Sequence, residues 1–150
     1  MSNDDNNNAA IAERHPDLER LDCLVGTWDV TGGAVGTATY EWMDGRFFLI
    51  QHVELEQFGE RVHGFEVIGH NQDFGSEPDA EIRSCFYGNM GDTLRYVYEV
   101  DGDILTSWGG EKGSPAFYRG TFSPDGNVVS GDWVYPGGGG YSSTMTRRAG

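Results

Sequence analysis

Two histidines and a glutamate stand where an imidazole and a carboxylate would meet on neighbouring strands. His52 and Glu54 alternate along one predicted strand, residues 46–57, and His63 lies on the next, residues 61–70. The short connection predicts a hairpin that places Glu54 opposite His63, with His52 one step along. A carboxylate beside an imidazole fixes its tautomer and raises its basicity, as a general base requires. His63, Glu54 and His52 are therefore candidate catalytic residues; the alternative is a cross-strand ion pair on the outside of the protein.

The same three residues have poor spacing for a metal site. Two histidines and one carboxylate match a known ligand set for divalent metals, but no compact His-x-His or Glu-x-x-His pattern accompanies them. His15, directly before Pro16, is expected to be exposed and inert. No phosphate-binding glycine loop, dinucleotide fingerprint or nucleophile elbow occurs either. We therefore expect no metal and no cofactor.

Aromatic-rich runs separated by glycine turns indicate an all-β fold. They recur at the roughly 8–12 residue spacing of a sandwich or barrel. The Asp44-Gly45 pair between two aromatic-rich runs is the strongest hairpin signal. We predict a closed, antiparallel, up-and-down barrel of about ten strands. The predicted strands are residues 27–31, 37–43, 46–57, 61–70, 81–87, 93–100, 104–108, 117–122, 128–135 and 141–147.

One short helix precedes the strands, and a polar tail precedes the helix. Residues 1–14 are acidic and polar and are expected to be disordered, which leaves residues 15–150 as a single domain. Pro16 suits the first helical turn and Gly26 the stop. The apolar residues that repeat at helical spacing are Leu18, Leu21 and Val25.

Both faces of the predicted strands mix polar and apolar residues, which favours a barrel with a partly polar interior over a dry core. Aromatic walls and polar tips suit a small-molecule site. The two longest loops, residues 71–79 and 109–115, are expected to line its mouth or act as lids. The candidate ligand-binding residues are Trp42, Tyr87, Arg95, Tyr96, Tyr98, Trp108, Tyr118, Arg119 and Trp133, together with Tyr141.

The charge argues against polyanionic partners. The chain has 24 acidic and 10 basic residues, for a formal net charge of −14. Nucleic acids and anionic membranes need clustered basic residues, and the adjacent basic pair here is Arg147-Arg148. The acid excess serves either solubility or adaptation to high salt, and a single lysine, Lys112, fits the second interpretation.

The sequence also carries compartment signals. Cys23 and Cys85 are the two cysteines and are expected to be reduced, because a disulfide framework would need more. No apolar region follows the polar N-terminus, and no run approaches the roughly 18 apolar residues of a membrane span. A cytoplasmic location is the expectation.

The segment Gly26-Thr27-Trp28 behind a short helix resembles the opening signature of the calycins, which include lipocalins, fatty-acid-binding proteins and nitrobindins. Those families place an arginine of the last strand across this tryptophan. The resemblance gives that structural role to Arg147 or Arg148, packed on Trp28. An arginine over an indole face contributes roughly 0.5–2 kcal/mol.

More narrowly, the chain resembles a lipocalin-like family of short prokaryotic barrels of unknown function. The matching stretches are residues 24–28, 44–48, 64–71 and 144–147. That family usually has Tyr-Asp where this chain has His70-Asn71, so no role carries over at that turn. Nitrobindin-like barrels ligate haem through a histidine near the C-terminus, and none follows His70 here. The resemblance implies a barrel and supplies no activity.

Three functional hypotheses follow. The first is a binding barrel for a small hydrophobic or aromatic molecule. The second is a cyclase- or isomerase-type enzyme in which a His–Glu pair or a tyrosine inside the barrel moves a proton. The third is a structural module with a filled interior that associates with a second copy as a homodimer. The interior distinguishes them, because only the third has no room for a ligand.

Overall fold

The computed structural model describes residues 13–149, which form one short helix and ten antiparallel strands. The tail predicted over residues 1–14 lies, except for Glu13 and Arg14, outside the described residues. The helix is η1 (Pro16–Leu24). The strands are β1 (Gly26–Gly32), β2 (Ala34–Trp42), β3 (Phe48–Gln57), β4 (Glu60–Gly69), β5 (Ile82–Gly88), β6 (Thr93–Asp101), β7 (Ile104–Gly109), β8 (Phe117–Phe122), β9 (Val128–Val134) and β10 (Tyr141–Arg147).

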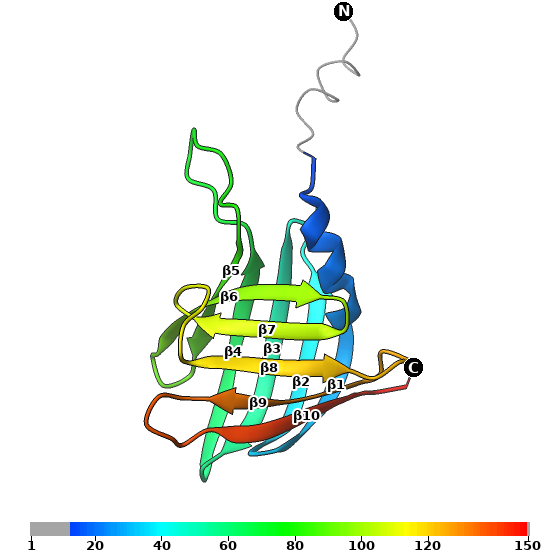
Figure 1. Ribbon diagram of the computed structural model, residues 1–150, viewed down its shortest axis with the longest axis vertical. Coiled ribbons are helices and arrows are strands. Elements are labelled where there is room, and N and C mark those ends of the chain that lie inside the picture. The colour runs from blue at the N-terminus through cyan, green and yellow to red at the C-terminus, as the bar shows by residue number, and fades with distance from the viewer. Residues whose placement is uncertain (1–12, 150) are drawn as a thin grey trace, which may run out of the picture.

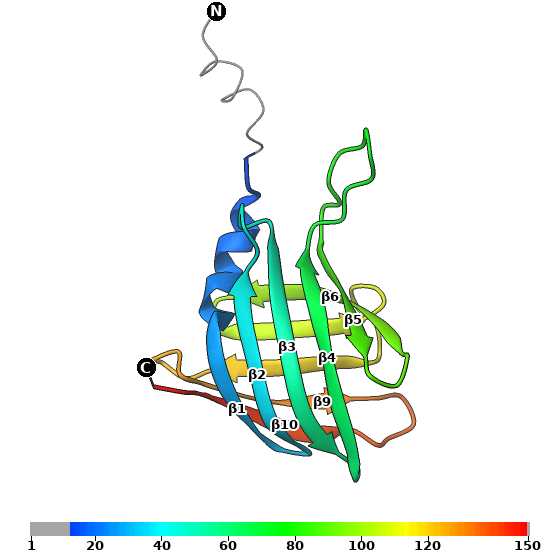
Figure 2. The ribbon, with the colours of Figure 1, turned by 180° about the vertical axis from the view of Figure 1, so that it is seen from behind.

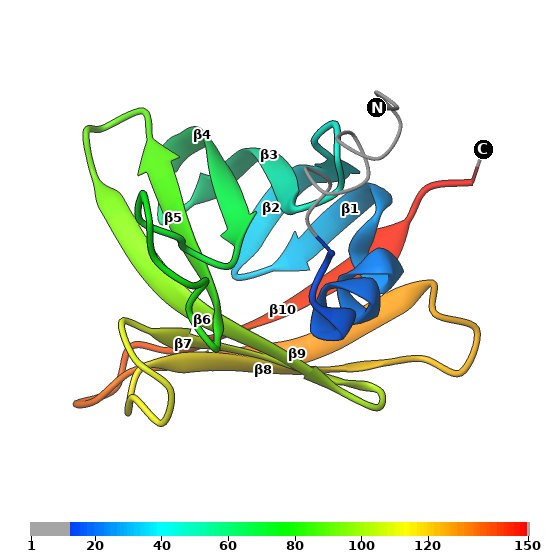
Figure 3. The same cartoon turned by 90° about the horizontal axis from the view of Figure 1, so that it is seen from above.

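The strands close into an up-and-down barrel, which confirms the predicted fold class. Each strand pairs with its neighbours in sequence, and β1 pairs with β10 to complete the ring. Figure 1 shows β6–β9 crossing in front of β2–β4, and Figure 2 shows β1–β4 from the other side. Viewed from above, β10 joins these two walls at one edge (Figure 3). Closure leaves no open sheet edge in the described chain.

Alternation along the strands separates an inner from an outer face. On β3, Leu49 and Val53 are buried, whereas His52 and Glu54 on the opposite parity are exposed. Gln51 shares the inner parity with the two buried residues. The interior of the barrel is therefore apolar with polar interruptions, as the mixed sequence pattern indicates.

The helix covers one end of the barrel. It is a 3₁₀ helix, with Leu18, Leu21 and Leu24 buried at three-residue spacing in the barrel core. The sequence analysis used α-helical spacing and predicted an apolar stripe of Leu18, Leu21 and Val25. That prediction is wrong at Val25. Three residues per turn bring Leu24 onto the buried face, and Val25 is instead the extended residue that leads into β1.

Trp28 and Arg147 pack together beneath the helix. Trp28 is fully buried, and its indole nitrogen donates to the Leu24 carbonyl at 2.8 Å. The Arg147 guanidinium lies 4.2 Å from the indole centroid and donates to the backbone carbonyls of Cys23, at 2.7 Å, and Val25. The last strand is thereby tied to the segment that leads from the helix into the first strand.

The long loops do not form a lid, contrary to the sequence expectation. In an up-and-down barrel, successive connections alternate between the two ends, so residues 71–79, between β4 and β5, lie at the helix end (Figures 1 and 2). The loop between β7 and β8 begins at the opposite end but packs outside the wall. There Glu111 pairs with Arg83 at 3.1 Å and Lys112 with Glu99 at 2.9 Å.

The helix found among the described residues is too short and too polar to span a bilayer.

Candidate functional site: the internal cavity

The barrel encloses a cavity of about 350 Å³. Its deeper residues include Tyr40 and Gln51, and its mouth lies at the end away from η1, where Met90 and Tyr135 line it. This volume is at the lower end of the roughly 300–1,000 Å³ range of small-molecule sites. The interior is therefore not filled by its own side chains, which argues against the hypothesis of a purely structural barrel.

One wall of the cavity is a cluster of aromatic rings. The Trp133 ring packs against Tyr118 and Tyr96, with centroids 5.4 and 5.8 Å away. Tyr135 stacks on Trp133 near the mouth, with an interplanar angle of 11° and centroids 6.1 Å apart. Such a surface offers flat apolar contact to a planar ligand and keeps the rings in fixed positions.

The inner part of the cavity is polar. Tyr98 donates to Glu66 at 2.7 Å, and Gln51 donates through its amide to the Tyr40 hydroxyl, also at 2.7 Å. The buried Ser107 hydroxyl has no hydrogen-bond partner within the described part of the chain. A ligand that reached this depth would meet a carboxyl group and several hydroxyls, one of which has unused hydrogen-bonding capacity.

Burial shifts the protonation equilibria of these groups. Removal from water raises the pKa of Glu66 above 4.5, and hydrogen bonds from Ser84 and Tyr98 offset part of that rise. The contact from Ser84 falls short of regular hydrogen-bond geometry, so Tyr98 is the defined donor. Burial, and then the nearby Glu66, raise the pKa of Tyr98 well above 10.0. Tyr98 therefore keeps its proton and donates.

The charged side chains among the described residues that line the cavity are all acidic. Of the described residues that line the cavity, none is Lys, Arg or His, while Glu66 and Asp92 are acidic. An anionic head group would enter without a cationic partner and next to carboxyl groups, at a desolvation cost of several kcal/mol. The wall therefore favours neutral or basic ligands over carboxylates and phosphates.

The candidate ligand-binding residues divide into two groups. Those that line the cavity are Tyr96, Tyr98, Tyr118, Trp133 and Tyr141. Trp42 lies at the helix end, where its indole donates to Asp22 at 2.7 Å. The others lie on strand positions of outward parity, since each alternates with cavity-lining neighbours: Tyr87, Arg95, Trp108 and Arg119.

The histidine–glutamate pair lies on the outer surface. Glu54 is directly opposite His63 in the β3–β4 pairing, and His52 is opposite Phe65, as the hairpin predicts. Nε2 of His63 and Oε1 of Glu54 are 3.4 Å apart, with both side chains more than half exposed. His52, Glu54 and His63 lie on the exposed parity of their strands and do not face the cavity, so the His63–Glu54 contact is a solvated cross-strand contact.

Sequence reasoning identified Tyr98 but missed the other polar residues of the inner cavity, including Glu66. Glu66 lies between Gly64 and Ile68 on the inner parity of β4, a position at which an acidic residue is unusual. That signal was present in the alternation. Tyr40 and Ser107 carried no such signal, because neither residue type is charged or purely apolar, so it does not mark the inner face of a strand.

No model of a known protein family matches the sequence, and no curated protein is significantly similar to it. The function of the cavity must therefore follow from its own geometry and chemistry.

Proposed function

We propose that this protein binds a small, largely apolar and neutral or basic molecule inside the barrel, with a hydrogen-bond donor of the ligand directed at Glu66. The observation that carries this proposal is the cavity of about 350 Å³ that extends from the open end to the Glu66–Tyr98 pair. The aromatic wall would hold the body of the ligand. The proposal also includes membership of the calycin-like barrels, consistent with the closed ten-stranded ring.

The preference for a ligand with a hydrogen-bond donor follows from the residues that line the cavity. The carboxyl group of Glu66 accepts one hydrogen bond from Tyr98 and retains further acceptor capacity. An amine, amide or hydroxyl would use that capacity, and a basic amine would also gain a charge-assisted hydrogen bond as Glu66 ionised. A fatty-acid carboxylate would have no cation to meet in this cavity.

A matched pair of fluorescent probes tests the proposal. We expect 1-aminoanthracene to bind with an increase in its emission, and anthracene-1-carboxylate, of the same ring system, to bind at least about tenfold more weakly, a difference of about 1.4 kcal/mol. The substitution Glu66→Gln should reduce that difference. Equal binding of the two probes would show that Glu66 does not select the head group.

Two single substitutions on β3 test the location. Leu55 lines the cavity and Glu56 next to it points outward. Leu55→Trp should project an indole into the cavity near its mouth and obstruct probe binding, whereas Glu56→Trp adds the same ring outside and should leave binding unchanged. Binding that survives in folded Leu55→Trp protein would refute the cavity as the site. Native mass spectrometry of freshly purified protein would identify any co-purifying molecule.

An isomerase-type proton transfer is the second candidate, and the buried Glu66–Tyr98 pair favours it. In its ionised form Glu66 can take a proton from a carbon next to a carbonyl; once Glu66 is protonated, the Tyr98 hydroxyl is released from the carboxylate and can donate to the enolate oxygen. The test is exchange of the C2 protons of 1-tetralone in D₂O, followed by NMR. Exchange no faster than in Glu66→Gln protein would rule out this activity for that ketone.

A further inference from the structure

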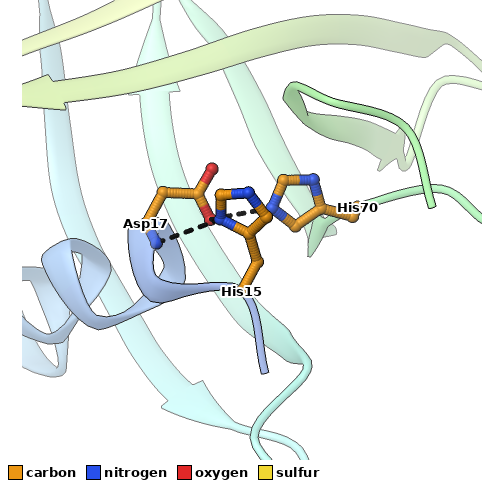
Figure 4. Close-up of side chains that lie close together, drawn as sticks. All are labelled: His15, Asp17 and His70. Atoms are coloured by element: carbon orange, nitrogen blue, oxygen red, sulfur yellow. Dashed lines mark hydrogen bonds and ion pairs between the residues drawn. The ribbon is translucent and has the colours of Figure 1, made fainter. Parts of the chain in front are cut away.

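Two histidines and an aspartate meet at the helix end of the barrel, away from the cavity. His15 caps the N-terminus of η1, Asp17 lies in its first turn, and His70 follows β4. Nδ1 of His15 and Nε2 of His70 lie 2.7 and 2.8 Å from the same oxygen, Oδ1 of Asp17 (Figure 4). All three potential ligand atoms lie within 4.8 Å of one another.

From this convergence we propose that His15, Asp17 and His70 form a binding site for a divalent transition metal ion, with Zn²⁺ as the best match. Two imidazoles and one carboxylate form a three-ligand zinc set that leaves a fourth position for water or a further ligand. In tetrahedral geometry, with zinc–ligand distances near 2.0–2.2 Å, ligand atoms lie about 3.3 Å apart. The two nitrogen–oxygen distances need to lengthen by about half an ångström, and the two imidazole nitrogens, which lie within 4.8 Å of each other, need to come to about 3.3 Å.

The surroundings of His70 are those of a metal-bound imidazole. Its Nδ1 lies 2.7 Å from the backbone carbonyl of Asp79, which can only accept a hydrogen bond, so the proton is on Nδ1. Metal-binding histidines usually donate their second nitrogen to a carbonyl or carboxylate in this way, which orients the ring and fixes the tautomer. With Nδ1 as the donor to this carbonyl, Nε2 is the nitrogen that faces Asp17 and that a metal would bind in place of a proton.

Asp79 is itself held in place. Its amide donates to the Asn71 carbonyl at 2.8 Å, and its carboxylate lies 3.2 Å from Nε of Arg83. The carbonyl that orients His70 therefore belongs to a fixed neck of the β4–β5 loop. The ligands on η1 are also fixed, because Pro16 between them sets the local backbone and the His15 carbonyl accepts from Leu18 at 3.0 Å.

Burial and charge suit a cation here. His70 is 6% exposed and Asp17 24%, so the inner two ligands are largely held by the protein, while His15 is 56% exposed and leaves a path from solvent. Nδ1 of His15 accepts a hydrogen bond from the Asp17 amide at 3.3 Å, so its lone pair already points into the cluster, and Nε2 of His70 faces the Asp17 carboxylate at 2.8 Å. A divalent ion between these atoms would bind both nitrogens in place of their present contacts, and the net charge of −14 attracts cations to the molecule.

Zinc titration of chelator-treated full-length protein tests the site. We expect one equivalent of Zn²⁺ to bind, with a Kd on the order of 1 µM or lower, and to raise the melting temperature. The exposed ligand gives the safest variant: His15→Ala should weaken Zn²⁺ binding by at least about tenfold and remove the thermal shift. Asp17→Asn should do the same with little change in side-chain size.

A matched control removes the other exposed histidines. The double variant His52→Ala/His63→Ala deletes two imidazoles from the outer wall and should bind Zn²⁺ as the unchanged protein does. Failure of the unchanged protein to bind Zn²⁺, or undiminished binding by folded His15→Ala protein, would overturn the proposal and leave the cluster as a hydrogen-bonded clasp. Probe binding in the cavity is a separate measurement, so the two proposals stand or fall independently.

Discussion

The hydroxyl of Tyr98 on β6 donates a 2.7 Å hydrogen bond to Oε2 of Glu66 on β4, two strands away across the interior. Both side chains are almost wholly buried, at 9% and 4% exposure. The bond gives a buried carboxyl group one fixed donor and leaves the rest of its hydrogen-bonding capacity directed into the cavity. It also makes the protonation of Glu66 a contributor to both ligand selection and stability.

Stability should fall as pH rises because of Glu66. Its pKa in the folded protein lies above 4.5, so between that value and the raised pKa the folded state holds the proton that the unfolded state has lost. Within this window the unfolding free energy decreases by about 1.4 kcal/mol as the pH rises by one. Glu66→Gln removes this contribution, so its stability relative to the unchanged protein should increase as pH rises through the window.

Urea denaturation at a series of pH values measures that difference. Tyr98→Phe provides a matched comparison, because losing the donor raises the pKa of Glu66 further and should extend the pH-dependent window upward. A stability difference between Glu66→Gln and the unchanged protein that is constant with pH would contradict the prediction.

Arg147 should be far more important to stability than its neighbour Arg148. Arg147 lies over the Trp28 indole and donates to the Cys23 and Val25 carbonyls, whereas Arg148 pairs with Asp29 at the surface. Arg147→Met should cost about 2–4 kcal/mol through the lost cation–π contact and charge-assisted hydrogen bonds. Arg148→Met should change stability by about 0.5 kcal/mol or less. Chemical denaturation of the two variants gives the comparison, and equal losses would contradict it.

The sequence predicted the scaffold better than the site, and particular residues explain why. Strand alternation and Asp-Gly turns are local signals, so they predicted all ten strands to within a few residues and the Glu54–His63 pairing. Alternation does not say which parity faces inward when both faces are mixed. Tyr96 and Tyr98 were therefore grouped with Arg95 and Tyr87, although only the first two line the cavity.

The helix-end cluster could not be found from spacing. Asp17 and His70 are 53 positions apart and meet only because β4 ends beside the start of η1. The length of a loop is likewise a poor guide to its place, since the order of the strands decides which end of the barrel each connection occupies. Residues 71–79 show this most clearly: successive connections alternate between the two ends of the barrel, and the β4–β5 connection falls at the helix end.

Cys23 should react slowly in the folded protein. Burial raises the pKa of its thiol to about 11, so little thiolate is present near neutrality. In a Cys85→Ser background, iodoacetamide at pH 8 should modify Cys23 roughly two orders of magnitude more slowly in the folded than in the urea-unfolded chain. Mass spectrometry of timed samples measures the rates. Equal rates in the two states would mean that the thiol is not protected.

The β4–β5 loop should be dispensable for binding in the cavity. Asn71 and Asp79 close its neck through a 2.8 Å backbone hydrogen bond, so residues 72–78 can be replaced by a short Gly-Ser turn that keeps both residues. Loop length affects closure entropy only slowly, and the loop lies at the end away from the mouth. Affinity for 1-aminoanthracene should therefore stay unchanged.

Tyr135→Ala at the mouth should weaken the affinity for 1-aminoanthracene, because Tyr135 stacks on Trp133 in the aromatic wall. A shortened loop that lowered probe affinity more than Tyr135→Ala would show that ligand enters from the helix end after all.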